Sequence, residues 1–205
     1  MIRTFIHGLT NQTDALAAAR LGVDGIGFIL DDRNERYIEY TLSRQIIQHF
    51  PPMTHVFLQP TDYTPAVLED LVQKLRVSNL LVPVQEYSRD LESLSARITL
   101  TGTADRLLDF VDTVSGRFNL LPKDLLLSML LEMGKVDLQE WRDINQYHYL
   151  YIPCDVLPEY IPLAVNYFKP AVLCFEGTTE SHTGLQDYPL IQEYVQAVHS
   201  VVERV

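Results

Sequence analysis

Short apolar runs alternate with amphipathic stretches from one end of the chain to the other. The apolar runs are continuous, without a polar residue at every second position, which is typical of strands buried on both faces of a parallel sheet. They predict strands at Arg3–Ile6, Gly25–Leu30, Thr54–Leu58, Asn79–Val82, Arg97–Leu100, Asp124–Ser128, Tyr147–Ile152 and Ala171–Phe175.

The amphipathic stretches between these runs predict helices. The stretch Thr13–Leu21 begins at a threonine suited to capping and ends at Gly22, and Thr64–Leu75 has Pro65 at its first helical position. The other predicted helices are Thr41–Phe50, Thr103–Val114, Asp137–Asn145, Leu157–Phe168, Pro189–Glu203 and a short one at Tyr87–Leu94.

Eight strands, each followed by a helix, recur about every 24 residues, close to the minimal βα repeat. Strict alternation of strand and helix implies a parallel sheet. Even spacing of eight units favours a closed barrel over an open doubly wound sheet. The predicted fold class is therefore α/β, a compact single-domain (β/α)₈ TIM barrel spanning residues 1–205, because no linker or shift in composition divides the chain.

Composition narrows the classes of partner and the compartment. The chain has 205 residues, 47% of them hydrophobic, and a formal net charge of −11, which argues against nucleic acid or an anionic membrane as a partner. Its two cysteines, Cys154 and Cys174, are expected to be buried thiols in a reducing compartment. The N-terminal residues do not resemble a signal peptide, and no apolar run approaches the ~20 residues of a membrane span. We expect a cytoplasmic protein.

The carboxyl ends of the strands, where barrels of this class carry their chemistry, bring together one imidazole, one guanidinium and several carboxylates. His7, Asp155 and Glu176 could hold a divalent metal, but the sequence has no short metal-binding spacing, so we expect solvated polar groups, no metal and no cofactor. His7 and Ser128 could form a base and a nucleophile, although the sequence offers no third group to orient them.

These strand ends also carry a resemblance to the phosphoribosylanthranilate isomerase family. Residues 5–10 read F-I-H-G-L-T where the family reads K-I-C-G-L-T, and residues 21–29 read L-G-V-D-G-I-G-F-I against G-A-D-x-I-G-F-I/V. Arg36, Tyr37 and Ile38 follow the family's R-Y-V. Beyond the first forty residues, the similarity is limited to short, separated matches. The resemblance implies a compact (β/α)₈ barrel of this length and a role in tryptophan biosynthesis.

The resemblance also implies a chemistry and a set of residues. Family members convert an aminoaldose phosphate into an aminoketose by an Amadori rearrangement, with a cysteine base at the end of strand 1 and an aspartic acid at the end of strand 6. Here those positions are predicted to be His7, which can act as a base, and Ser128, which is too weak an acid near neutrality.

The family's substrate-binding positions are altered as well. Its phosphate is held by backbone N–H groups of glycine-containing pairs after strands 7 and 8. Here these positions are predicted to be Asp155 and the segment Glu176, Gly177 and Thr178, so that two carboxylates would repel a phosphate. Arg36 is at the position that, by the resemblance, binds the carboxylate of anthranilate in family members.

Two functions remain open on this basis. The first is an isomerase of the family, or a relative acting on another small polar substrate, with activity altered or lost. The second is a catalytically idle TIM-barrel module for binding or regulation. In both, the ligand is a small molecule at the carboxyl-terminal mouth, and the protein is a monomer or a homodimer.

Overall fold

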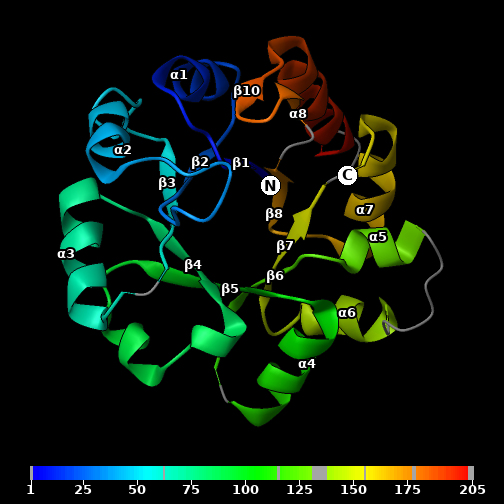
Figure 1. The fold of residues 1–205 in the computed structure, drawn as a ribbon. Helices are drawn as coiled ribbons and strands as arrows, with labels where there is room; N and C mark the ends of the chain where they lie inside the picture. The colour runs from blue at the N-terminus through cyan, green and yellow to red at the C-terminus, as the bar shows by residue number, and fades with distance from the viewer. Residues whose placement is uncertain are drawn as a thin grey trace.

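Eight parallel strands close into a barrel in sequence order, with β1 paired to β8 (Figure 1). The computed structural model describes residues 2–61, 63–114, 116–130, 138–154, 156–176 and 179–202. The strands are β1 Arg3–His7, β2 Gly25–Ile29, β3 His55–Gln59, β4 Asn79–Pro83, β5 Arg97–Gly102, β6 Asn119–Pro122, β7 Tyr149–Pro153 and β8 Val172–Glu176. The predicted (β/α)₈ TIM barrel is confirmed.

Helices surround the barrel on its outside (Figure 1). They are α1 Gln12–Arg20, α2 Tyr40–Ile47, α3 Pro65–Leu75, α4 Ala104–Thr113, α5 Leu125–Leu130, α6 Leu138–Ile144, α7 Ile161–Phe168 and α8 Tyr188–Val202, with short 3₁₀ turns η1 Val84–Glu86, η2 Arg89–Ser93 and η3 Pro158–Tyr160. Side-chain caps fix two helix starts: Asn11 accepts from the Asp14 N–H, and Thr64 accepts from the Val67 N–H. The helix predictions are confirmed to within a few residues at most ends.

The sixth strand is the one element that the sequence pattern misplaced. The predicted strand Asp124–Ser128 is wrong, because β6 is Asn119–Pro122 and the residues from Leu125 onward form helix α5. Leucine favours helices, and a short continuous apolar run does not by itself distinguish a strand from a buried helix. Pro122 argues against a strand interior, but a proline is tolerated here, at the strand's last residue.

Two apolar layers make up the core. The larger one lies between the strands and the helices and includes Trp141, which is fully buried. The smaller one fills the barrel itself, where the rings of Phe5 and Phe57 stack with centroids 4.0 Å apart. Space for these rings comes from β2: a Cβ on Gly27 would lie 2.7 Å from a ring carbon of Phe5 and 2.6 Å from the His7 ring.

A small hairpin that the sequence did not predict follows β8. Its strands, β9 Glu180–His182 and β10 Leu185–Gln186, lie beside α1 and α8 (Figure 1). Gly184, at its turn, accepts a hydrogen bond from the Thr10 hydroxyl at 2.9 Å. Buried Asp14 accepts from the Gln186 N–H at 3.1 Å and from the Tyr188 hydroxyl at 2.7 Å. The hairpin is therefore tied to the loop and helix that follow β1.

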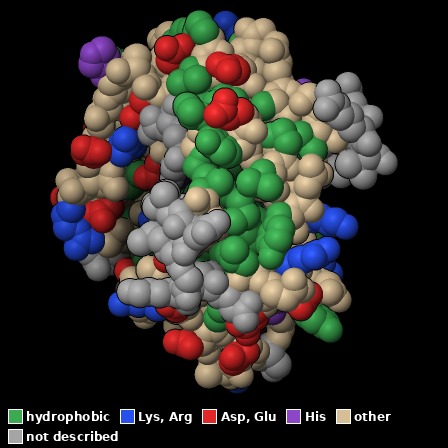
Figure 2. Space-filling model, turned by 90° about the vertical axis from the view of Figure 1, so that its right-hand side faces the viewer, with side chains coloured by type: hydrophobic (Ala, Val, Ile, Leu, Met, Phe, Trp, Pro, Cys, Tyr) green, Lys and Arg blue, Asp and Glu red, His purple; other side chains and the backbone are tan. Residues whose placement is uncertain are grey.

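Several surface and compartment predictions can be compared with the structure. Cys154 and Cys174 are both buried, as predicted. Among the described residues, no helix has the length and apolar character needed to cross a membrane. Apolar side chains gather on the face in Figure 2, and α7 with its preceding turn exposes Leu157, Tyr160 and Leu163. Whether the protein is a monomer or a homodimer stays a prediction.

Candidate functional site

The carboxyl ends of the strands form the mouth of the barrel, and His7 lies there at the end of β1. Alternation along β1 turns Phe5 and His7 into the barrel, with ring centroids 5.6 Å apart. The side chain of His7 is 4% exposed. The ladder between β1 and β8 pairs His7 with Glu176, so both side chains enter the mouth side by side.

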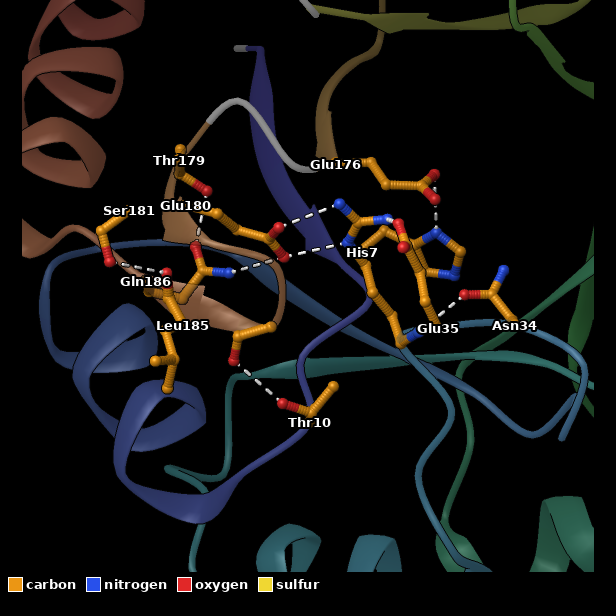
Figure 3. A network of polar contacts seen from close by, with 12 residues as sticks. His7, Thr10, Asn34, Glu35, Glu176, Thr179, Glu180, Ser181, Leu185 and Gln186 are labelled. Atoms are coloured by element: carbon orange, nitrogen blue, oxygen red, sulfur yellow. Dashed lines mark hydrogen bonds and ion pairs between the residues drawn. The ribbon is translucent and has the colours of Figure 1, made fainter.

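His7 and Glu176 form an imidazole–carboxylate pair. Nδ1 of His7 lies 3.2 Å from Oε2 of Glu176 (Figure 3). An ionised carboxylate only accepts hydrogen bonds, so the pairing sets the proton on Nδ1. Nε2 is buried and has no hydrogen-bond partner among the described residues. In the neutral ring with Nδ1 protonated, Nε2 carries the lone pair, and the arrangement is that of an oriented general base.

The ionisation of Glu176 is strongly favoured. The hydrogen bond from His7 is the main cause that lowers the pKa of Glu176 to about 2, against partial burial, which raises it. The positive charges of Lys123 and Arg36 lower it further. Glu176 is therefore an anion throughout the physiological pH range, which is what an orienting partner for an imidazole requires.

Acidification is expected to remove the stability that this pair contributes. The pKa of Glu176 lies below its ordinary value of 4.5, so its contribution is present above that pH and is lost as the pH falls toward about 2. More than a third of the Glu176 side chain is exposed, which limits the effect to about 1 kcal/mol. Urea unfolding at pH 6 and pH 3 should show the gap between wild type and Glu176→Gln narrowing at pH 3. The exposed Glu159→Gln is the control, and a gap that does not change with pH would contradict this role.

Lys123 directly follows the last residue of β6, at the same end of the barrel as this pair. Its N–H continues the barrel ladder by donating to the Gly102 carbonyl at 2.8 Å. It lies in a turn two residues after the inward-facing Leu121, and its side chain is exposed. The effect of its charge on Glu176 agrees with that placement. In the described part of the chain, its ammonium makes no ion pair.

Ser128 does not lie at the end of a strand. It was predicted there because the run Asp124–Ser128 was interpreted as strand 6, but it falls within helix α5, beyond the end of β6. Its side chain lies outside the described part of the structure. Asp124, just before α5, accepts a hydrogen bond from the Ala104 N–H at 2.7 Å and so stabilises the start of α4.

Arg36 comes from the loop after β2 and is held by carboxylates of the chain itself. Its Nε and Nη2 donate to the two carboxylate oxygens of Glu180, on the hairpin, at 3.0 and 2.9 Å (Figure 3). Its Nη1 donates to Glu35 at 2.8 Å. These bonds, above all those to Glu180, raise the pKa of Arg36. Gly8, whose φ of +81° suits glycine, lets the stem of Arg36 approach the backbone, since a Cβ there would lie 2.7 Å from Cδ.

Three of the predicted binding residues, Asp155, Gly177 and Thr178, lie outside the described residues. Within the residues that the structure describes, no group of three His, Cys, Asp or Glu side chains could hold a metal ion. Of the predicted metal set, His7 and Glu176 do meet, as a hydrogen-bonded pair.

No pattern in the sequence pointed to Lys123 or Glu180 as site residues. Lys123 would have followed from a correct β6, because it directly follows that strand's last residue. Glu180 is 144 residues from Arg36 along the chain, and no local pattern connects them. Glu176 was predicted as part of a phosphate site, whereas in the structure it pairs with His7.

The barrel and its mouth define an α/β-barrel protein with a candidate acid–base site at the carboxyl ends of its strands. No family model matches the chain. It is 22% identical over 202 residues to the N-(5′-phosphoribosyl)anthranilate isomerase of Marinomonas sp., covering 94% of this chain and 96% of that enzyme. It is 44% identical to the isomerase of Nitrosomonas eutropha over 62 residues, 29% of this chain and 30% of that enzyme. Over nearly its whole length, the chain is therefore similar in sequence, at 22–23% identity, to enzymes named phosphoribosylanthranilate isomerase.

Solved structures agree on the fold. The isomerase from Thermotoga maritima superposes with a TM-score of 0.80 at 19% identity, covering 98% of this chain and 100% of that one. A phosphoribosylanthranilate isomerase in complex with reduced 1-(o-carboxyphenylamino)-1-deoxyribulose 5-phosphate gives the same TM-score at 18% identity. At these identities the comparison establishes the architecture.

Proposed function

We propose that the chain is a phosphoribosylanthranilate isomerase-type enzyme of tryptophan biosynthesis whose acid–base residues have changed. The family's reaction moves a proton from C2′ of an aminoaldose phosphate as the aminoketose forms. The observation that carries the proposal is the contact of 3.2 Å between His7 and Glu176, which leaves Nε2 of His7 buried with no partner among the residues that the structure describes. Full-length similarity to these isomerases supports the choice of reaction.

In this proposal His7 is the base that removes the C2′ proton, and Glu176 is a positioning residue. Glu176 keeps the imidazole in the tautomer that presents Nε2, and its negative charge stabilises the imidazolium formed after proton transfer. A lone histidine would be free to rotate and to bind its proton at either nitrogen. The pair therefore supplies the orienting group that the sequence alone did not reveal.

Lys123 is the proposed proton donor, in place of Ser128, which the resemblance had put at the position of the family's acid. An ammonium group can donate a proton to the substrate where the family uses a carboxylic acid, and its charge attracts the anionic groups of a sugar phosphate. Its place directly after β6, at the mouth, and the effect of its charge on the pKa of Glu176 support this role. Because the positive charges of Lys123 and Arg36 act on Glu176, the repulsion that this carboxylate would exert on a phosphate is reduced.

The proposal is tested with the family's own substrate. Purified protein is incubated with N-(5′-phosphoribosyl)anthranilate, and the loss of that compound's fluorescence is followed with time. Turnover above the rate of the same mixture containing His7→Asn protein supports the proposal. Equal rates for the two proteins would overturn it.

One observation favours the second function, a catalytically idle binding or regulatory module. The guanidinium predicted to meet a substrate carboxylate is already bound by Glu180, a carboxylate whose side chain is 4% exposed. Because the guanidinium of Arg36 is already bonded to Glu180, it is less available to bind the carboxylate of anthranilate. This agrees with a protein that no longer converts the family's substrate. Binding of a sugar phosphate by calorimetry, with no fluorescence loss in the assay above, would favour this function.

A further inference from the structure

A pocket opens at the opposite end of the barrel from the mouth, where the strands begin. Its volume is ≈ 330 Å³. The rings of Phe5, Phe57 and Tyr151 line it toward the barrel interior. Polar side chains from the starts of the strands line the rest, namely Arg3, Asp24, His55, Asn79 and Arg97. Neither the predicted site nor the proposed function uses any of these residues.

The rim of this pocket is positively charged in a chain with a net charge of −11. Arg3 and Arg97 begin β1 and β5, which lie on opposite sides of an eight-stranded ring. Burial, with the charges on Arg3 and Arg97, lowers the pKa of His55, so its ring is neutral at pH 7 and accepts from Nη1 of Arg3 at 3.1 Å. Asp24 is the one acidic side chain in the described lining, and its Oδ2 accepts from the Thr4 N–H at 2.8 Å.

Two groups in the lining lack a partner among the described residues. Asn79 is 5% exposed, and its Oδ1 is buried without a hydrogen bond. Buried amide oxygens are nearly always hydrogen-bonded, because an orphaned one costs about 1–3 kcal/mol. The guanidinium of Arg97 forms no hydrogen bond or ion pair in the described part of the chain. The pocket thus combines a buried acceptor that needs a donor with an exposed cation, on the neighbouring strand, that an anion can meet.

We propose that this pocket binds a small organic carboxylate that also carries a hydroxyl or amino group. The carboxylate lies against Arg97, with Arg3 across the rim, and the hydroxyl or amino group donates to Oδ1 of Asn79. The aromatic rings toward the barrel interior favour a ligand with an apolar or aromatic body. This site is separate from the mouth, and the inference does not depend on the proposed isomerase activity.

Matched ligands test both halves of the recognition. 3-Phenyllactate has the carboxylate, the α-hydroxyl and an aromatic body, and 3-phenylpropionate lacks only the hydroxyl. Calorimetry with wild-type protein should show phenyllactate binding about fivefold more tightly than phenylpropionate, the equivalent of one hydrogen bond. Inorganic phosphate is the third probe, and binding of phosphate with none of either carboxylate would overturn the choice of ligand.

Variants then locate the binding. Arg97→Gln, at an exposed strand start, should weaken phenyllactate binding about tenfold, with partial recovery in Arg97→Lys. Asn79→Leu should abolish the preference for the hydroxyl without lowering the free energy of unfolding, because it removes an unpaired oxygen. His7→Asn, in the mouth, should leave binding unchanged. The proposal would be overturned if binding were lost in His7→Asn but kept in Arg97→Gln. It would also be overturned if wild-type protein bound neither carboxylate at millimolar concentration, or if a second copy of the chain filled the pocket.

Discussion

Replacing His7 by asparagine is expected to lower kcat/KM for N-(5′-phosphoribosyl)anthranilate by about 10²–10⁴-fold, the usual contribution of a positioned acid–base group. Asparagine is similar in size and can still bond to Glu176, but it has no lone pair that accepts a proton near neutrality. The fluorescence assay gives the rate, and circular dichroism confirms that the barrel is retained. A loss smaller than threefold would exclude His7 as the base.

Two companion variants separate chemistry from positioning. Glu176→Gln should lower kcat about 10- to 100-fold and move the acid limb of the pH–rate profile to lower pH, because the imidazolium loses its neighbouring negative charge. A purely structural role for Glu176 would not move that limb. Lys123→Met should lower the rate while Lys123→Arg retains part of it, if the positive charge at the end of β6 takes part in the reaction.

The second large effect is expected from Gly27→Ala. A Cβ at this position would lie 2.6 Å from Cδ2 of His7 and 2.7 Å from the Phe5 ring, distances that force the rings to move. Overpacking of this kind destabilises by ~1–3 kcal/mol, and displacement of His7 from Glu176 should also lower the isomerase rate. Urea unfolding and the fluorescence assay measure the two effects separately.

Gly102→Ala is the matched control for that substitution. Gly102 ends β5, and an added Cβ would come closest to a methyl group of Val84, at 3.2 Å, with Cγ of Leu107 in ordinary contact at 3.6 Å. A small adjustment of that side chain accommodates it, so the change in stability should stay below about 1 kcal/mol. Equal destabilisation by the two substitutions would contradict the idea that β2 is specifically fitted around His7 and Phe5.

The sequence pattern predicted seven of the eight strands and the closed barrel, since buried parallel strands give continuous apolar runs of distinct length. It failed at β6, because that strand has only four residues and includes Pro122, which argues against a strand. The leucines that follow are compatible with a strand as well as with a helix. That failure also placed the end of strand 6 at Ser128, which lies in α5, instead of at Pro122. A shift of a few residues in one strand was enough to change the chemistry assigned to the mouth.

The polar contacts at the mouth could not be predicted from the sequence for another reason. His7 and Glu176 are 169 residues apart, and Arg36 and Glu180 are 144 apart. Which side chains meet depends on the register between β1 and β8 and on a hairpin too short to leave a periodic signal. Local propensity contains no information about either, so these pairs could only be found in three dimensions.

The ladder between β1 and β8 is also the seam at which the ring of strands closes. Because His7 and Glu176 sit opposite each other across it, the proposed base is assembled only when the first and last strands join. Local opening at this seam would separate the imidazole from its carboxylate before the rest of the barrel unfolds. In this protein, the rate of turnover would therefore depend directly on whether β1 and β8 stay paired. A circular permutation that joins the two edges covalently should preserve activity under conditions in which the natural chain order begins to lose it.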